Sequence, residues 1–226
     1  MTKLVIVRHA EAEGNQKGLF QGHTDADVSE KGYVQLDLLA VRCRNMERSV
    51  IYSSPLKRAL LTAQAINQFR PVPIQIEPDL IEINGGVWEN IPWKDLPKRF
   101  PEESHHWTVE PWAFAPPGGE TMTHVYDRIY HAVREIADRH RGETVFIVTH
   151  GCVIRNLICR LKYNDIKKLD EVYWCDNTAL SVVEIDENGH WHLTVDGDNS
   201  HLDKETSTIA HQVWWLPGGK KRVSSR

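Results

Sequence analysis

The sequence is poor in cysteine and has no long apolar run near its start. The apolar run at residues 4–7 is too short for a signal peptide or a membrane span. No CxxC pair occurs, and the cysteines have apolar neighbours, which predicts reduced thiols packed in a core rather than a disulfide framework. These cysteines are Cys43, Cys152, Cys159 and Cys175. We therefore expect a cytoplasmic protein with no membrane partner.

An excess of positive charge is also missing. The 27 Lys and Arg residues are outnumbered by 31 Asp and Glu residues, which excludes a broad basic surface for nucleic acid. With 226 residues, of which 41% are hydrophobic, the chain is long enough for one substantial core. Because no repeat, low-complexity tract or linker interrupts it, we predict a single domain over residues 1–226, ending in a flexible basic tail at 218–226.

Apolar patterns typical of strands and helices alternate along the chain. The predicted strands are 4–7, 49–52, 74–76 and 144–149, and the predicted helices are 29–48, 54–69, 120–141 and 152–161. Ser54 and Pro55 are the expected N-cap and first residue of the second helix. Asn188-Gly189 indicates a hairpin between strands at 179–185 and 191–195. We predict an α/β fold of three layers, with a mainly parallel central sheet and a C-terminal antiparallel hairpin.

Residues 83–119 differ from this pattern, because they are rich in Pro, Trp and acidic residues. We interpret them as an inserted segment that caps a site. Its tryptophans either wall an apolar substrate pocket or form a small core that holds the segment in place. These are Trp88, Trp93, Trp107 and Trp112. Near the C-terminus, Trp214-Trp215 either docks a second subunit, which would give a homodimer, or covers the edge of the sheet.

Three of the predicted strands lead to cationic or imidazole side chains. Arg8-His9 follows the first strand and His150 follows the strand at 144–149, while Arg58 lies in the first turn of the helix after the second strand. The carboxyl ends of parallel strands meet at one edge of a sheet, and helix N-termini there favour anions. A single His at a strand end is usually structural. The combination predicts a cationic pocket for a small anion such as phosphate.

The sequence resembles the histidine phosphatase superfamily, which includes cofactor-dependent phosphoglycerate mutases and small phosphatases. The resemblance rests on Arg8-His9-Ala10-Glu11 with Asn15, Gln21-Gly22, Glu30-Lys31-Gly32, Ser53-Ser54-Pro55-Leu56-Lys57-Arg58-Ala59 with Thr62-Ala63, Leu80-Ile81-Glu82 with Gly86-Val87-Trp88-Glu89, Pro117-Gly118-Gly119-Glu120, and Thr149-His150-Gly151. The sequence departs from the family pattern at Ala10, Ala12, Gly85 and Asn90. None of these four positions supplies a reacting side chain.

The resemblance implies a role for each motif residue. His9 is the expected nucleophile that forms a phosphohistidine, and Glu82 is the expected proton donor and acceptor. The positive charge that holds the phosphoryl group comes from Arg8, Arg58 and His150. Further substrate contacts are expected from Asn15, Gln21, Gly22 and Gly151. Because Arg and His supply the positive charge, neither a metal nor a cofactor is expected.

Alternatives remain for the proton carrier, for metal binding and for the reaction. Glu77, Asp79, Glu89 and Glu120 lie near Glu82 in sequence. The pairs His105-His106 and His190/His192 suggest metal binding, but no Cys or carboxylate cluster completes a ligand set.

For the reaction, we expect a phosphatase of small phosphorylated metabolites, with a phosphomutase or a non-catalytic phospho-ligand sensor as alternatives. Basic and acidic residues are mixed in the inserted segment, which favours the phosphatase over the mutase.

Overall fold

The computed structural model describes residues 1–211, so Trp214-Trp215 and the predicted tail at 218–226 lie outside the described residues. Its sheet has six strands in the order β3-β2-β4-β1-β5-β6. They are β1 (Thr2–Arg8), β2 (Val50–Ser53), β3 (Ile74–Ile76), β4 (Thr144–Thr149), β5 (Leu180–Ile185) and β6 (Trp191–Asp198). The first four strands are parallel, and β5 and β6 form the antiparallel hairpin. The predicted mixed α/β fold is therefore confirmed.

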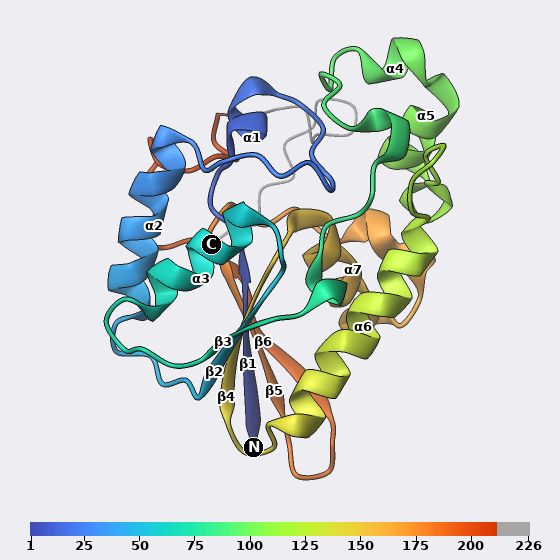
Figure 1. Cartoon of the computed structure of the whole chain (residues 1–226). Helices are drawn as coiled ribbons and strands as arrows, with labels where there is room; N and C mark the ends of the chain where they lie inside the picture. The colour runs from blue at the N-terminus through green and yellow to red at the C-terminus, as the bar shows by residue number, and fades with distance from the viewer. Residues whose placement is uncertain (212–226) are drawn as a thin grey trace.

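Helices cover both faces of the sheet (Figure 1). One face carries α2 (Glu30–Cys43) and α3 (Lys57–Asn67), and the other carries α6 (Met122–Arg139) and α7 (Gly151–Tyr163). Side chains of a strand alternate between the two faces. In β1, Val5 and Val7 belong to the core under α2 and α3, whereas Leu4 and Ile6 belong to the core under α6 and α7. Both faces of β1 are buried, which explains its unbroken apolar sequence.

Two helix boundaries differ from the prediction by three residues or more, and the others differ by at most two. The first long helix ends at Cys43 rather than at residue 48, because Arg48 folds back and its Nη1 donates to the carbonyl oxygens of Cys43 and Met46. The helix expected from Ser54 begins at Lys57, with Leu56 as its N-cap. Ser54 instead continues the sheet hydrogen bonding, since its backbone N–H donates to Val148 O.

The shorter helical elements are α1 (Glu13–Lys17), η1 (Pro78–Leu80), η2 (Gly86–Trp88), α4 (Leu96–Arg99), α5 (Pro101–Val109), η3 (Pro111–Ala113) and η4 (Ile166–Glu171). In Figure 1, α1, α4 and α5 lie at the end of the molecule to which the parallel strands point. Trp88 is almost fully buried and packs edge-on against Phe20 and Phe114. Trp107 and Trp93 are partly buried around this aromatic core. The inserted segment is thus anchored by its own aromatic side chains.

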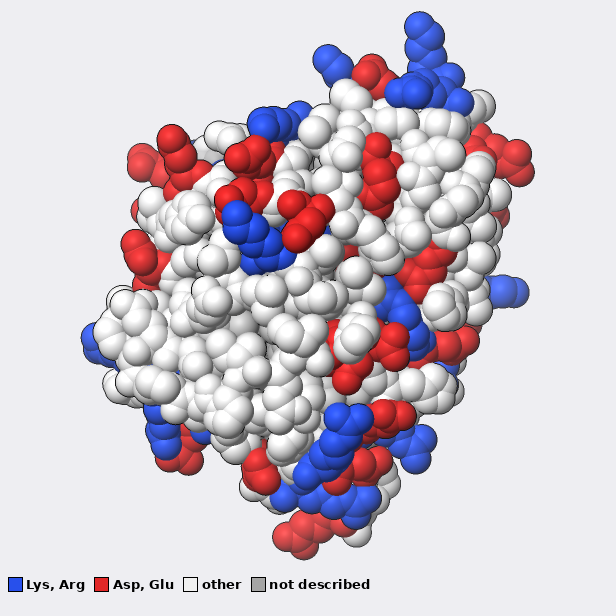
Figure 2. Space-filling model, viewed as in Figure 1, with Lys and Arg blue, Asp and Glu red and all other residues white. Residues whose placement is uncertain are grey.

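Other surface and core features follow the composition. All four cysteines are free thiols; three are buried and Cys175 is partly exposed. On the face shown in Figure 2, basic side chains lie among acidic ones, and no broad basic area forms there. In the part of the chain that is described, no helix is long and apolar enough to cross a bilayer.

Candidate active site

The predicted site residues meet at the carboxyl edge of the parallel strands. Arg8 ends β1 and His9 follows it, while His150 directly follows β4 and precedes α7. The ring centroids of His9 and His150 are 5.0 Å apart. Arg58, in the first turn of α3, acts electrostatically on both rings. The structure therefore brings together four side chains from three distant parts of the sequence.

His9 is held as a neutral imidazole with one free nitrogen. Its Nδ1 lies 2.6 Å from Ala10 O, and since a carbonyl only accepts, Nδ1 carries the proton. Burial lowers the pKa of His9 well below its usual value, and the charges of Arg58 and Arg8 lower it further. The Nε2 atom consequently keeps a lone pair near neutral pH. This is the form that a nucleophilic imidazole needs.

Three nitrogen atoms of the site are buried without a hydrogen-bond partner: Arg8 Nε, Arg58 Nε and His150 Nδ1. The rest of each guanidinium is anchored. Arg8 Nη1 donates to Cys175 O at 2.6 Å, and the two Nη atoms of Arg58 donate to main-chain oxygens at 2.7 and 2.8 Å. Buried polar groups are seldom left unpaired in proteins. Three buried nitrogens near His9 are thus left without a partner, which suits an anion with several acceptor oxygens.

The carboxyl group of Glu82 is buried and lines a small cavity together with Arg8 and His9. Its two oxygens accept from the backbone N–H groups of Ile83 at 2.9 Å and Cys152 at 3.2 Å. Desolvation by burial raises its pKa, although these hydrogen bonds and the charges of Arg58 and Arg8 oppose the rise. A carboxyl group with a raised pKa can donate a proton closer to neutral pH. Two nearby acidic residues, Glu89 and Glu120, have lowered pKa values instead. The Glu89 carboxylate accepts from backbone N–H groups, and the Glu120 carboxylate accepts from Arg128.

The cavity is small, about 30 Å³, and four of its thirteen lining residues are Phe or Trp. It is lined by Arg8, His9, Asn15, Leu19, Phe20, Gln21, Glu82, Ile83, Trp93, Trp107, Gly151, Cys152 and Trp174. A larger cavity of about 610 Å³ lies at the other end of the sheet, between Met1, Tyr130, Arg141 and Trp191. This larger cavity is lined by none of His9, His150, Arg8 and Arg58, so it is not the candidate active site.

The expected substrate contacts divide into two groups. Asn15, Gln21 and Gly151 line the cavity, and Gln21 Oε1 is buried without a partner. Gly22 does not line it. Its N–H donates to Glu89 and its carbonyl oxygen accepts from Arg58, so its place in the structure is to position the guanidinium.

The structure gives the tryptophans of the inserted segment different positions. Trp93 and Trp107 wall the cavity, as one of the two interpretations predicted, while Trp88 belongs to the aromatic core of the other. Trp112 is partly buried and outside the cavity lining.

At Gly151 the backbone lies close to the site, and a side chain there would disturb it. A Cβ atom on this residue would lie 3.1 Å from Arg8 Nε and 3.2 Å from Trp174 Cζ3. Glycine at the first position of α7 therefore leaves room for the guanidinium that carries one of the unpaired donors.

The sequence analysis did not predict that the loop at residues 176–178 holds the backbone of Arg8 and His9 by hydrogen bonds. Asn177 Nδ2 donates to His9 O at 2.8 Å, and the N–H of Thr178 donates to Arg8 O at 3.0 Å. The neighbouring Asp176 carboxylate accepts from Ser207 Oγ and from the N–H of Thr208. The signal was present, because a strand antiparallel to β1 must begin at the edge where β1 ends.

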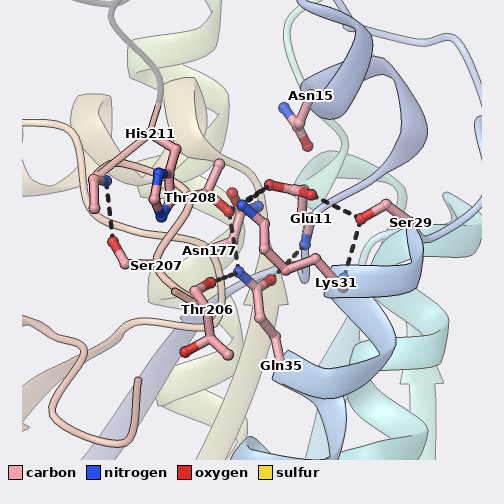
Figure 3. A network of polar contacts seen from close by, with 12 residues as sticks. Glu11, Asn15, Ser29, Lys31, Gln35, Asn177, Thr206, Ser207, Thr208 and His211 are labelled. Atoms are coloured by element: carbon pink, nitrogen blue, oxygen red, sulfur yellow. Dashed lines mark hydrogen bonds and ion pairs between the residues drawn. The ribbon is translucent and has the colours of Figure 1, made fainter. Parts of the chain in front are cut away.

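A second brace joins the segment that follows His9 to α2 and to the C-terminal segment (Figure 3). Glu11, two residues after His9, accepts from Ser29 Oγ at 2.8 Å and from Thr208 Oγ1 at 2.9 Å, and pairs with Lys31 at 2.8 Å. Gln35 accepts from the N–H of Glu11 and donates to Thr208 Oγ1. Residues near position 208 thus help to fix the chain on which His9 lies.

Neither histidine pair lies in the site. His105 and His106 are on α5, and His190 and His192 both contact Asp186 at the β5–β6 turn. Within residues 1–211, no group of three or more His, Cys, Asp or Glu side chains is placed to hold a metal ion.

Comparisons with known proteins agree with this geometry. Phosphoserine phosphatase 1 of Hydrogenobacter thermophilus is 37% identical over 190 residues, which is 83% of this chain and 88% of that protein. The metal-independent phosphoserine phosphatase of Arabidopsis thaliana is 34% identical over 89% of this chain and 84% of that protein. The solved structure of YhfR from Bacillus stearothermophilus superimposes with a TM-score of 0.85 at 35% identity, covering 89% of this chain and 99% of that one. Residues 4–198 match the histidine phosphatase superfamily (branch 1), and the chain belongs to that family.

Proposed function

We propose that this phosphatase, a phosphoric monoester hydrolase, acts through a phosphohistidine on His9. The observation that carries the proposal is the set of three buried, unpaired nitrogens around the nucleophile: Arg8 Nε, Arg58 Nε and His150 Nδ1. A phosphoryl group has the negative charge and the several acceptor oxygens that this set requires. Phosphoryl transfer depends mainly on positioning and on offsetting charge, which fixed donors provide.

In the first half of the reaction, His9 Nε2 attacks the phosphorus atom and the bond to the ester oxygen breaks. Nδ1 keeps its proton and donates it in the hydrogen bond to Ala10 O, which stabilises the ring as positive charge develops. Glu82 gives its proton to the departing alkoxide, so that a neutral alcohol leaves. The raised pKa of Glu82 keeps that proton available nearer to neutral pH.

In the second half, the ionised Glu82 removes a proton from a water molecule as that water attacks the phosphorus atom of phospho-His9. The N–P bond breaks, orthophosphate forms, and both side chains return to their starting protonation states. Arg8 and Arg58 hold the phosphoryl oxygens throughout. Nη1 of Arg8 and both Nη atoms of Arg58 donate to main-chain carbonyls, so little reorganisation is needed when charge develops.

The substrate that we propose is a small phosphorylated metabolite, with phosphoserine to be tested first. Two relatives, at 37% and 34% identity, are named phosphoserine phosphatases. The cavity supports a small substrate, because Phe20, Trp93, Trp107 and Trp174 surround it closely. Gln21 Oε1 gives it one unpaired acceptor, which suits a donor such as the ammonium group of phosphoserine.

The test is release of orthophosphate from phosphoserine and of p-nitrophenol from p-nitrophenyl phosphate. We expect turnover by the wild type and by His131→Ala, which changes an exposed histidine of α6, and none by His9→Ala. Rapid quenching with labelled ester should trap an acid-labile phosphate on the wild type and on His131→Ala, but not on His9→Ala. Turnover by His9→Ala, or absence of the labile adduct, contradicts the mechanism. Isomerisation of 3-phosphoglycerate without release of orthophosphate would identify a mutase instead.

A further inference from the structure

Ser54 makes a short hydrogen bond to the second imidazole of the site. Ser54 follows β2 and His150 follows the neighbouring strand β4, and His150 Nε2 lies 2.7 Å from Ser54 Oγ. Both residues are completely buried. The other ring nitrogen, Nδ1, has no partner. The hydroxyl of Ser54 both donates and accepts, so this bond can be made by either neutral form of the ring.

A helix-capping role does not account for this serine. The helix after it begins at Lys57, and its N-cap is Leu56. Ser54 Oγ is 3.4 Å from the N–H of Leu56, a long contact in which the oxygen accepts. The proton of the hydroxyl is not used in that contact and remains free to be donated to His150.

Two arrangements are consistent with a neutral His150. In one, Nε2–H donates to Ser54 and Nδ1 keeps the lone pair. In the other, the Ser54 hydroxyl donates to Nε2 and Nδ1 carries the hydrogen. Burial lowers the pKa of His150, and the charges of Arg58, His9, Arg128 and Arg8 act in the same direction, so the neutral ring dominates at neutral pH.

A bound anion distinguishes the two arrangements. A lone pair on Nδ1 repels a phosphoryl oxygen, whereas an N–H donates to it. We propose that Ser54 is a positioning residue that donates to His150 Nε2 and thereby keeps the proton of the neutral ring on Nδ1, directed at the phosphoryl group. This inference rests on the proposed function, since it assumes that the anion is the phosphoryl group of the substrate.

The hydroxyl group also fits the charged ring. If His150 becomes protonated as negative charge builds up beside it, Nε2 then carries a hydrogen and Ser54 Oγ accepts it. A serine can make either bond without moving, because its hydroxyl both donates and accepts. An alanine side chain can make neither bond. In Ser54→Ala, the neutral ring of His150 can carry its proton on either nitrogen, and only the protonated ring always has a hydrogen on Nδ1.

The first test observes the proton directly. In protein labelled with nitrogen-15 histidine and saturated with orthophosphate near pH 8, His150 should show a protonated Nδ1 and an unprotonated Nε2, with the signals assigned by their loss in His150→Gln. A protonated Nε2 with an unprotonated Nδ1 overturns the proposal, and so does a ring protonated on both nitrogens.

The second test compares variants by their pH profiles. Ser54→Ala should lower kcat/KM for p-nitrophenyl phosphate about tenfold at pH 8, the size of one lost hydrogen bond, and the loss should shrink as the pH falls and His150 becomes protonated. Ser54→Thr keeps the hydroxyl and should restore most of the rate. Ser181→Ala, which removes a buried serine hydroxyl on β5, is the matched control and should leave kcat/KM unchanged.

The outcomes separate this inference from the proposed function. A loss in Ser54→Ala that is the same at every pH, or a loss equal to that of Ser181→Ala, overturns the positioning role while the wild type still turns over. Absence of turnover in the wild type with both esters overturns the proposed function itself. The nitrogen-15 measurement needs no variant at Ser54, so it decides the proton position even if Ser54→Ala fails to fold.

Discussion

Replacing Arg58 by Met tests the anion site most directly. Methionine has a similar reach but removes the positive charge and every N–H donor. In the structure, the two Nη atoms hold the carbonyl oxygens of Thr24 and Gly22, and Nε is the buried donor without a partner. Loss of one preorganised donor to developing charge lowers kcat by about 10²–10³, which corresponds to about 3–4 kcal/mol of activation free energy. We expect a fall of that size.

Stability should respond much less than activity. Burial lowers the pKa of Arg58 from 12.5 to about 10, so the folded protein holds this charge at a cost of about 3 kcal/mol, which the Met variant removes. The same variant leaves two carbonyl groups without their donor, at about 1–3 kcal/mol each. The two contributions have opposite signs and similar sizes. The free energy of unfolding should therefore change by less than the activation free energy.

Lys57→Met provides the matched control, because it makes the same substitution one position earlier. Lys57 is exposed and forms an ion pair with Asp27, and exposed pairs contribute little. The assays are steady-state hydrolysis of phosphoserine and p-nitrophenyl phosphate, with thermal unfolding of each variant. The reasoning fails if Arg58→Met keeps more than about a third of the wild-type kcat, or if Lys57→Met loses as much as Arg58→Met.

Three further predictions concern the leaving group, the backbone and the brace. Glu82→Gln should slow hydrolysis of phosphoserine far more than that of p-nitrophenyl phosphate, and should remove the fall in rate with rising pH through the raised pKa of Glu82; equal losses on both esters refute this. Gly151→Ala should weaken inhibition by orthophosphate about tenfold, since its Cβ displaces Arg8 Nε; calorimetry showing unchanged affinity contradicts the displacement. Thr208→Val should destabilise the fold by about 1–3 kcal/mol, because Glu11 loses a buried donor; urea unfolding with an unchanged midpoint argues against the brace.

The strands and the catalytic edge could be predicted because their signals are local. The unbroken apolar runs at residues 4–7 and 144–149 are buried on both faces of the sheet, as such runs require. Once those strands are parallel, topology alone brings His9 and His150 to the same edge. The identity of Arg58 came from the family motif, and the structure places its guanidinium where both rings sense its charge.

The positions of Ser54, Asn177 and Thr208 could not be predicted, because they depend on contacts between loops, for which the sequence has no periodic signal. Ser54 was predicted as a helix cap because Ser-Pro is a frequent start, but the sheet keeps that residue in extended pairing and turns its hydroxyl to His150. Asn177 meets His9 across 168 positions and Thr208 meets Glu11 across 197. Pairings over such distances are set by how whole layers pack.

The reach of Thr208 to Glu11 has a consequence for the order in which the enzyme is made. The family match ends at residue 198, and every residue proposed to react lies before it. Ribosomes, however, deliver the chain from its beginning, so Ser207 and Thr208 emerge after all of those residues. A nascent polypeptide that stops at residue 198 carries every residue proposed to react but lacks these partners of Glu11 and Asp176. Two buried carboxylates then lose donors that the longer chain supplies.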